Sequence, residues 1–392
     1  MSTSERCELC HQASLEPVYR AAGTARDLTV HLCRHCGLLQ SLPRIDRAPR
    51  RGATASGAAD WGNIRYGKGF RTAEAIAALR RHADLSAPAK LLDVGSNRGS
   101  FARQFLTVAP NASILAVEPD KRVAHSVDEL AGVELICARI EDVSLADESF
   151  DIVHSCHTIE HLAYPGKVLA EHWRVLKPGG LLVLDAPSTA LLESEDVVEE
   201  WFIDKHLYHF SARTLMRMVS AAGFEIIEAP APGDRENLLL VAVKTGLSAQ
   251  ALAPDPREVC EAEARITAYG RNRAANLAAL TAVATEIARL STGRIVIWGA
   301  GRLFDALITS GGLSPSLLTG LIDAHLGAYL PERHGLAVQP PQAIGEILPD
   351  VVVVMSRTFA DEITRTVRQL APNAQILTYG EMIGRARLQV AA

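Results

Sequence analysis

The chain has 392 residues, of which 48% are hydrophobic and 22% charged, with a formal net charge of -5. This length fills two or three domain cores, and no apolar run approaches the roughly 18 residues of a membrane span. The acidic balance argues against a general nucleic-acid binder. Because no apolar signal segment opens the sequence, we expect a soluble cytoplasmic protein without nucleic-acid or membrane partners.

Two cysteine pairs come first along the chain. Cys7 and Cys10 form one C-x-x-C pair, and Cys33 and Cys36 form a second. Zn²⁺ takes four soft ligands in a tetrahedron, and two such turns supply them, so we expect a structural zinc ion. The alternatives are two disulfides or free thiols, which the expected reducing compartment disfavours for the disulfides.

A buried strand, a tight glycine turn and a helix start are predicted over residues 89–101, around the pattern Asp93-x-Gly95-x-x-x-Gly99. This is how α/β folds form a nucleotide crevice. Asn97 takes the place of the middle glycine of the dinucleotide fingerprint. The next predicted strand, 113–117, ends at Glu118, where a carboxylate can accept both ribose hydroxyls of an adenosine.

Further motifs follow in a fixed order, and together they resemble the class I S-adenosylmethionine-dependent methyltransferases over roughly residues 68 to 243. They are Arg139-Ile140-Glu141-Asp142, Phe150-Asp151-Ile152-Val153-His154 and Leu176-Lys177-Pro178-Gly179-Gly180, the last leading into a strand to Asp185. The resemblance implies a Rossmann-like domain that binds S-adenosylmethionine.

The resemblance also implies cofactor-binding residues. It places the turn that begins after Asp93, with Gly95, Asn97 and Gly99, against the methionine part of the cofactor, and Glu118 at the ribose. It places Glu141, or its backbone, near the adenine. The Asn97 side chain either hydrogen-bonds the amino-acid end of the cofactor or is a turn residue that tolerates left-handed backbone.

His157-Thr158-Ile159-Glu160-His161 matches the H-x-x-E-H pattern of some zinc proteases. It directly follows the strand ending at His154, and the resemblance implies that this segment lies at the cofactor edge of the sheet, so we interpret the protease match as accidental. His161 is expected either to face the acceptor or to serve as a helix cap or supporting residue.

His206, Tyr208 and His209 are three titratable rings within four residues, ahead of a helix predicted over 212–222 with Ser211 as its N-cap. On a loop that closes over the sulfonium, a histidine with a near-neutral pKa can take a proton from the acceptor. The alternative is aromatic packing that closes the edge of the sheet.

A linker over 247–256 precedes a long helix predicted from Arg257 to about Ser291. A second strand and turn follow at 294–302, and another strand, 318–322, ends at Asp323, so we predict a second Rossmann-like α/β domain. An NAD site is disfavoured because Phe304 stands where the third glycine of the fingerprint should be.

The order of these parts resembles the three-domain C-methyltransferases of deoxysugar biosynthesis. The C-terminal resemblance rests on Asp323, Gly327-Ala328-Tyr329-Leu330-Pro331, His334-Gly335-Leu336-Ala337-Val338, Pro349-Asp350 and Asp361-Glu362-Ile363. It implies that the C-terminal domain binds the nucleotide of a nucleotide-linked sugar, and that a Tyr-x-Glu-His loop supplies the base that forms an enolate.

The last position of that loop is His206 in this chain. Ile203 stands in place of the tyrosine, and Lys205 in place of the glutamate that would orient the histidine. The strand end Ser356-Arg357 also departs from the Trp-Asn that is usual in the family.

We therefore predict an N-terminal zinc module over 1–60, a methyltransferase domain over 61–246 and a C-terminal domain over 247–392, as a monomer or homodimer. The expected reaction is C-methylation of a nucleotide-linked ketosugar, with His206 as base and Tyr208, His209 and His161 orienting the substrate. The alternatives are O- or N-methylation of another small molecule, or a binding protein that keeps the fold without turnover.

Overall fold

The computed structural model describes residues 5–25, 27–44, 70–121, 127, 130–246, 252–328 and 330–391. The chain divides into two compact units. Unit 1 contains residues 1–51, 65–193 and 202–266, and unit 2 contains 52–64, 194–201 and 267–392. Each is described by itself. Half of the expected linker, 247–251, and Tyr329 lie outside the described residues.

Unit 1 is built on a seven-stranded sheet in the order β10-β11-β8-β7-β4-β5-β6. Five strands are parallel, and the β10–β11 hairpin adds to β8 in the antiparallel sense. The strands are β4 (Lys90–Val94), β5 (Ser113–Val117), β6 (Val133–Ile136), β7 (Phe150–Cys156), β8 (Leu176–Asp185), β10 (Phe224–Glu228) and β11 (Leu240–Lys244). The predicted strands 113–117 and 181–185 are confirmed.

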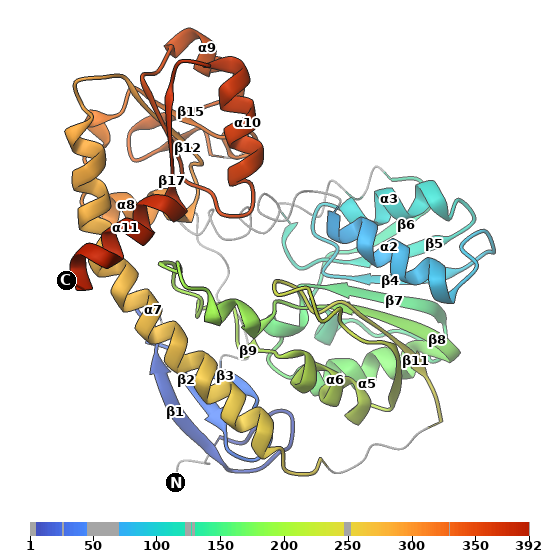
Figure 1. Cartoon of the computed structure of the whole chain (residues 1–392). Coiled ribbons are helices and arrows are strands. Elements are labelled where there is room, and N and C mark those ends of the chain that lie inside the picture. The colour runs from blue at the N-terminus through green and yellow to red at the C-terminus, as the bar shows by residue number, and fades with distance from the viewer. Residues whose placement is uncertain are drawn as a thin grey trace. The chain divides into compact units, whose positions relative to one another are not determined.

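Helices cover both faces of this sheet (Figure 1). They are α2 (Phe70–His82), α3 (Ser100–Val108), α5 (Pro165–Val175) and α6 (Ala212–Ala221). Leu91 packs with the residues of α2 and α3, whereas its neighbour Leu92 packs on the other face with those of α5 and α6, as the alternation of a strand requires. Ser211 caps α6 through a capping box, which confirms the predicted N-cap.

A second, antiparallel sheet of unit 1 has the order β1-β2-β3-β9. Its strands are β1 (Leu15–Arg20), β2 (Thr29–Cys33), β3 (Leu39–Leu42) and β9 (Tyr208–His209). The fourth strand comes from the region that the sequence placed on a loop. The cysteine segment also shares one hydrophobic cluster with the large sheet, in which Cys36 and Leu38 pack with Leu92 and Val94.

Unit 2 contains a six-stranded sheet in the order β14-β15-β13-β12-β16-β17, parallel except for β14. Its strands are β12 (Ile295–Trp298), β13 (Gly320–Ile322), β14 (Glu332–Arg333), β15 (Leu336–Gln339), β16 (Val351–Val354) and β17 (Gln375–Thr378). Its helices are α8 (Arg302–Thr309), α9 (Ile344–Ile347), α10 (Ala360–Leu370) and α11 (Tyr379–Ala391). This is the second α/β sheet that the sequence predicts.

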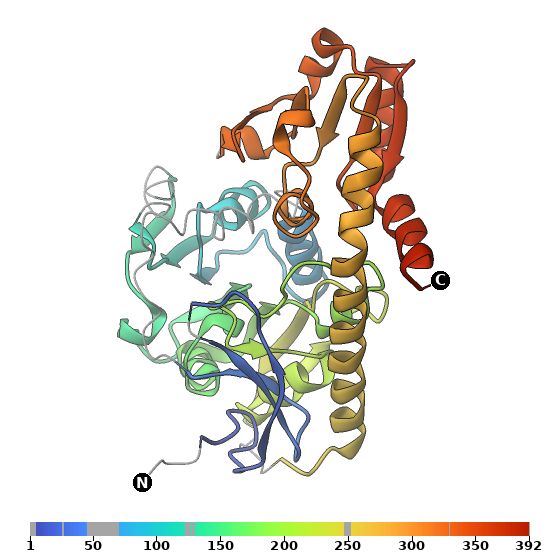
Figure 2. The ribbon, with the colours of Figure 1, turned by 90° about the vertical axis from the view of Figure 1, so that its left-hand side faces the viewer.

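The long predicted helix is confirmed as α7, Pro256–Arg289 (Figure 2). At 1.5 Å per residue, its 34 residues span about 50 Å. Residues up to Ile266 belong to unit 1, and those from Thr267 belong to unit 2. No helix among the described residues combines the length and apolar character needed to cross a membrane.

Candidate active site

The turn after β4 lies at the carboxyl end of the parallel strands. The backbone is left-handed at Gly95 (φ 75°), Asn97 (φ 49°) and Gly99 (φ 72°), and Gly99 caps the start of α3. The N–H groups of Gly95 and Ser96 donate to the carbonyl of Val117 at 2.8 and 3.3 Å. Asn97 therefore has the turn conformation that its side chain tolerates well.

Glu118 follows β5 and is 7% exposed. Its Oε2 accepts the backbone N–H of Asn97 at 2.8 Å, and its Oε1 accepts that of Asp120 at 2.8 Å. A carboxylate oxygen can accept more than one hydrogen bond. Glu141 lies in the turn Ile140–Asp142 after β6, where it pairs with Arg139 at 3.1 Å. The predicted cofactor residues thus come from the ends of three neighbouring strands.

Asp93 is buried inside the sheet. Its Oδ1 lies 2.7 Å from Nδ1 of His154 on β7, and the ring of Phe101 stacks on that imidazole with centroids 3.5 Å apart. The Oδ2 atom has no hydrogen-bond partner among the described residues. An ammonium or hydroxyl group of a ligand is the kind of partner that such an orphaned acceptor needs.

Thr158 joins the turn to the next segment. Its hydroxyl lies 3.2 Å from the carbonyl of Val94 and 3.1 Å from that of Cys156, and it donates to them. A Cβ atom added to Gly95 would overlap the Thr158 Oγ1. Only glycine fits at position 95, because it combines the positive φ with this close approach.

Three polar side chains, those of Glu160, His161 and His206, lie close together near Thr158. Glu160 and His161 lie in a 3-10 turn, Ile159–His161, and His206 lies in the segment before β9. One ligating atom of each of these three side chains lies within 4.8 Å of the others. The rings of His161 and His206 are 4.9 Å apart.

Two hydrogen bonds, one from the backbone and one from the His161 ring, hold the 3-10 turn and the segment before β9 together. Leu207 N–H donates to the carbonyl of Glu160 at 2.8 Å, and His161 Nδ1 donates to the carbonyl of Lys205 at 2.8 Å. Burial lowers the pKa of His206 well below its usual value and raises the pKa of Glu160 to about 8. The His206 imidazole is therefore neutral at neutral pH and can accept a proton, but it is a weaker base than the near-neutral histidine that the sequence suggested.

His157 and Asp185 extend this polar group toward the sheet. His157 has a left-handed backbone (φ 48°), and its Nε2 lies 3.8 Å from Asp185 Oδ2. Arg71 from α2 lies 3.9 Å from the same carboxylate and also bonds the side chain of Asn237. Sequence reasoning missed Glu160, His157, Asp185 and Arg71 as site residues, although the H-x-x-E-H spacing was a usable signal.

Tyr208 and His209 do not join this group. The Tyr208 hydroxyl donates to the carbonyl of Ala163 at 2.7 Å, and His209 Nε2 lies 2.8 Å from the Ser41 hydroxyl, both within buried surroundings. The His209 ring meets Phe202 edge to face at 4.6 Å. The structure places these two side chains in the small sheet and its core, whereas the sequence suggested a loop over the cofactor.

Comparison with known proteins agrees with this geometry. Residues 92–184 match the family model described as a methyltransferase domain. This segment is similar to methyltransferase domains, the kind of domain that the sequence motifs predicted. The sequence-based identification of the domain and of its cofactor is confirmed, whereas the likeness to deoxysugar C-methyltransferases stays a prediction.

The methyltransferase domain is similar to curated proteins over part of their length. An uncharacterized methyltransferase of Mycolicibacterium vanbaalenii is 39% identical over 98 residues, 24% of this chain and 37% of that protein. A malonyl-[acyl-carrier protein] O-methyltransferase of Methylococcus capsulatus is 26% identical over 39% of this chain and 60% of its own length. The chain thus spans less than two thirds of these relatives. A Listeria monocytogenes structure titled as a putative S-adenosylmethionine-dependent methyltransferase is 16% identical, with TM-score 0.37, over 45% of this chain and 99% of its own.

The four N-terminal cysteines lie together ahead of the methyltransferase domain. The Sγ atoms of Cys7 and Cys36 are 3.5 Å apart, as are those of Cys10 and Cys33, and all four lie within 4.8 Å of one another. These distances exceed the roughly 2.05 Å of a disulfide. They approach the roughly 3.8 Å edge of a tetrahedron with Zn–S bonds of about 2.3 Å, so the thiols fit a zinc ion.

The second cysteine pair also contacts the start of α7. Asp255 N–H donates to the carbonyl of His35 at 2.7 Å, and Arg34 pairs with Glu263 at 2.9 Å. Gly37 has φ 80°, and a Cβ atom there would overlap Glu258. The cysteine turn and the first turns of α7 therefore fit together only with glycine at position 37.

The turn after β12 in unit 2 is also held by an acidic residue that follows the next strand, although its cap Gly301 is extended where Gly99 is left-handed. Ala300 N–H donates to Asp323 Oδ2 at 3.1 Å, while Asp323 Oδ1 accepts the N–H groups of His325 and Leu326. Phe304 is fully buried, with its ring 5.6 Å from that of His334. A packed phenylalanine occupies the position where a dinucleotide fingerprint has its third glycine.

Arg357, one of the departures from the expected family pattern, is engaged inside unit 2. Its guanidinium bonds Asp196 at 2.7 Å and both oxygens of Glu199 at 2.8 and 3.0 Å, and it lies 5.1 Å from the ring centre of Tyr379. These contacts give the arginine a role in holding residues 194–201 against the C-terminal sheet.

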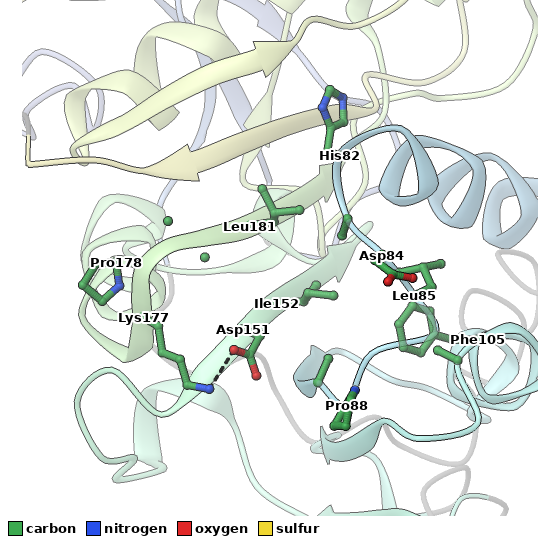
Figure 3. Close-up of a pocket in the computed structure, with 15 residues that line it drawn as sticks. His82, Asp84, Leu85, Pro88, Phe105, Asp151, Ile152, Lys177, Pro178 and Leu181 are labelled. Atoms are coloured by element: carbon green, nitrogen blue, oxygen red, sulfur yellow. Dashed lines mark hydrogen bonds and ion pairs between the residues drawn. The ribbon is translucent and has the colours of Figure 1, made fainter.

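A hollow of about 300 Å³ lies at the opposite end of the methyltransferase sheet from the cofactor turn (Figure 3). Ala89, just before β4, and Asp151, near the start of β7, line it, and Lys177 bonds Asp151 at 2.7 Å. Ligands of parallel α/β sheets bind outside the carboxyl ends of the strands, and this hollow is at the amino ends. We therefore do not assign the active site to it.

Proposed function

We propose that the protein is an S-adenosylmethionine-dependent C-methyltransferase that acts on a nucleotide-linked ketodeoxysugar. The observation that carries the proposal is the acid–base group of buried Glu160 and the partly exposed His161 and His206, which Thr158 connects to the glycine turn of the methyltransferase domain. A carbon next to a carbonyl must lose a proton to attack the methyl sulfonium, and this group contains the neutral imidazole of His206.

The residues of the turn fit the cofactor. Gly95, Asn97 and Gly99 would face its methionine part, and Glu118 would accept the ribose hydroxyls. Asp93 would engage the amino group through its orphaned Oδ2, and Glu141 would lie near the adenine. Bound S-adenosylmethionine supplies the electrophilic methyl group.

On the acceptor side, we propose His206 as the base and His161 as its neighbour. The hydroxyl of Tyr208 and the imidazole of His209 are occupied by Ala163 and Ser41, so we place both in support of the His206 segment. The second α/β sheet is the proposed site for the nucleotide of the acceptor, and the four cysteines are the proposed ligands of a structural zinc ion.

Calorimetric titration of the S-adenosylhomocysteine-saturated protein with dTDP, UDP, GDP and CDP tests the acceptor class. Binding of one nucleotide in preference to the others would support the proposal and select the sugar donor to try. If S-adenosylhomocysteine binds and none of the nucleotides does, the nucleotide-sugar assignment is wrong. If S-adenosylhomocysteine itself does not bind, a binding protein without turnover becomes the better account.

The O-methyltransferase name of the Methylococcus capsulatus relative favours transfer to oxygen as the second candidate. The same histidines would then deprotonate a hydroxyl. Incubation of the nucleotide-linked 4-ketosugar with protein and S-adenosylhomocysteine in D₂O separates the two. Deuterium at the carbon next to the keto group supports C-methylation, whereas binding without exchange favours O-methylation.

A further inference from the structure

Glu160 is the buried carboxyl group of this acid–base group, and the roles proposed for His206 and His161 do not say what it does. Its side chain is 1% exposed, and neither Oε1 nor Oε2 has a hydrogen-bond partner among the described residues. An ionised carboxylate in such surroundings is strongly unfavourable unless a proton or another cation neutralises it.

The neighbouring histidine specifies where that proton lies. His161 Nδ1 is 2.8 Å from the carbonyl of Lys205, and a carbonyl only accepts, so Nδ1 carries a hydrogen. In the neutral tautomer that this bond selects, Nε2 has a lone pair, and it lies 3.5 Å from Glu160 Oε1. Two acceptors that face each other in the interior repel, so one proton must be shared between Glu160 and His161.

His206 is held beside this pair by the chain itself. The Glu160 carbonyl binds Leu207 N–H, and the His161 ring binds the carbonyl of Lys205, so both neighbours of His206 are fixed to the 3-10 turn. Position 205 carries a lysine where the expected loop has an orienting glutamate. Glu160, on a different segment, has a carboxylate oxygen within 4.8 Å of a ring nitrogen of His206.

Other charged groups also face Glu160. His157 Nδ1 lies 3.5 Å from Oε1, while Arg71 and Lys205 favour the ionised form and Asp185 disfavours it. Burial outweighs the two cations and raises the pKa of Glu160 to about 8. Burial also lowers the pKa of His206, so a neutral acid stands next to a neutral base.

We infer that Glu160 shares one proton with His161 and thereby acts as the counter-carboxyl of His206, so that the three side chains work as one acid–base unit. The inference rests on the proposed function. The acceptor carbon loses its proton to the His206 ring and gains the methyl group as the methyl–sulfur bond breaks. Glu160 releases its own proton through His161, whose side chain is 31% exposed, to water, and its carboxylate then faces the His206 imidazolium. Glu160 is a positioning residue, since it acts through His206.

Infrared spectroscopy of protein labelled with ¹³C-glutamate tests the shared proton without any acceptor. At a pH below the Glu160 pKa of about 8, we expect the carbonyl stretch of a protonated carboxylic acid. Glu160→Gln should remove this band, whereas Glu225→Gln, at an exposed position of β10, should keep it. S-adenosylhomocysteine binding by both variants checks that they are folded.

Absence of the band from the wild-type protein would overturn the inference. This outcome does not depend on whether the variants fold. A second zinc ion per chain, lost in Glu160→Gln, would overturn it in favour of a metal held by the same three side chains. The D₂O exchange then tests the catalytic part. Glu160→Gln should slow exchange at least tenfold with unchanged nucleotide affinity. No exchange by the wild-type protein contradicts the proposed function, whereas equal exchange by wild type and variant contradicts only the role of Glu160.

Discussion

The carboxylate of Glu118 accepts the backbone N–H of Asn97 at 2.8 Å, across the mouth of the cofactor turn. Asp323 and Ala300 repeat this relationship in unit 2 at 3.1 Å. In both sheets, an acidic residue at the end of the second strand fixes the turn after the first. In unit 1 the same carboxylate is also the proposed ligand of the cofactor ribose.

Glu118→Gln should weaken S-adenosylhomocysteine binding. The amide has a single acceptor oxygen, so the variant loses either the contact to Asn97 or the one to Asp120, together with the charge that attracts the ribose hydroxyls. Loss of a charged hydrogen bond of about 1.5–3 kcal/mol corresponds to a Kd about ten- to a hundredfold higher. Calorimetry measures this change. Asp323→Asn is the matched control, and an equal loss in both variants would contradict the assignment.

Gly95→Ala should abolish cofactor binding but lower the free energy of unfolding only moderately. The left-handed backbone costs alanine about 1–2 kcal/mol, and the new Cβ atom would displace Thr158. Gly179→Ala provides the control, because Gly179 has φ 77° and open space around its Cβ position. Both variants should lose similar stability in denaturant titrations, but only Gly95→Ala should lose S-adenosylhomocysteine. Retained binding would show that the turn is not the cofactor site.

Cys33→Ser should release zinc and expose the N-terminal segment. The three remaining thiols cannot complete the tetrahedron, and the four-cysteine cluster is part of the shared hydrophobic core. Elemental analysis should find zinc in the wild-type protein and in Cys260→Ser, which alters an exposed thiol, but not in Cys33→Ser. Limited proteolysis should then cut the variant within the cysteine segment. A folded, metal-free wild-type protein would contradict the zinc assignment.

His209 should make unit 1 sensitive to acid. Burial lowers its pKa in the folded protein to about 3, whereas an unfolded histidine titrates near about 6.5. Between these values the unfolded chain binds a proton that the folded chain does not, so stability is complete above this window and falls as the pH drops, by up to about 1.4 kcal/mol per pH unit. His209→Gln should flatten the decline in denaturant midpoint, and the exposed His325→Gln should not. A variant with unchanged slope would contradict the buried neutral imidazole.

Arg357→Lys should destabilise unit 2 by about 1–3 kcal/mol. Lysine keeps the charge but cannot bond Asp196 and both oxygens of Glu199 at once, so partly buried carboxylates lose charged hydrogen bonds. Arg385→Lys alters an exposed pair with Glu286 and should cost less than about 1 kcal/mol. Thermal unfolding compares the two variants. Equal effects would indicate that the Arg357 contacts add nothing to stability.

Local patterns predicted much of the fold. The strand and turn at Asp93, the acidic end of β5 and the cap at Ser211 each depend on a few consecutive residues, so the sequence was sufficient for them. The role of Glu160 was not predictable, because its surroundings form only when the segment before β9 folds back on the 3-10 turn. The positions of Tyr208 and His209 were not predictable for the same reason, since their partner strand β3 lies more than 160 residues away along the chain.

The helix α7 limits how this chain can be divided or recombined. Glu258 is buried near its start in unit 1, whereas Tyr269 and Asn276 are buried farther along it in unit 2. A fragment cut at the linker before α7 would strip the cysteine segment of its contacts with Asp255 and Glu258. A single residue inserted near Ile266 would rotate all later side chains by about 100° relative to the earlier ones, because the helix has 3.6 residues per turn. Exchange of C-terminal modules between related chains is therefore expected to succeed only when the join preserves the helical register.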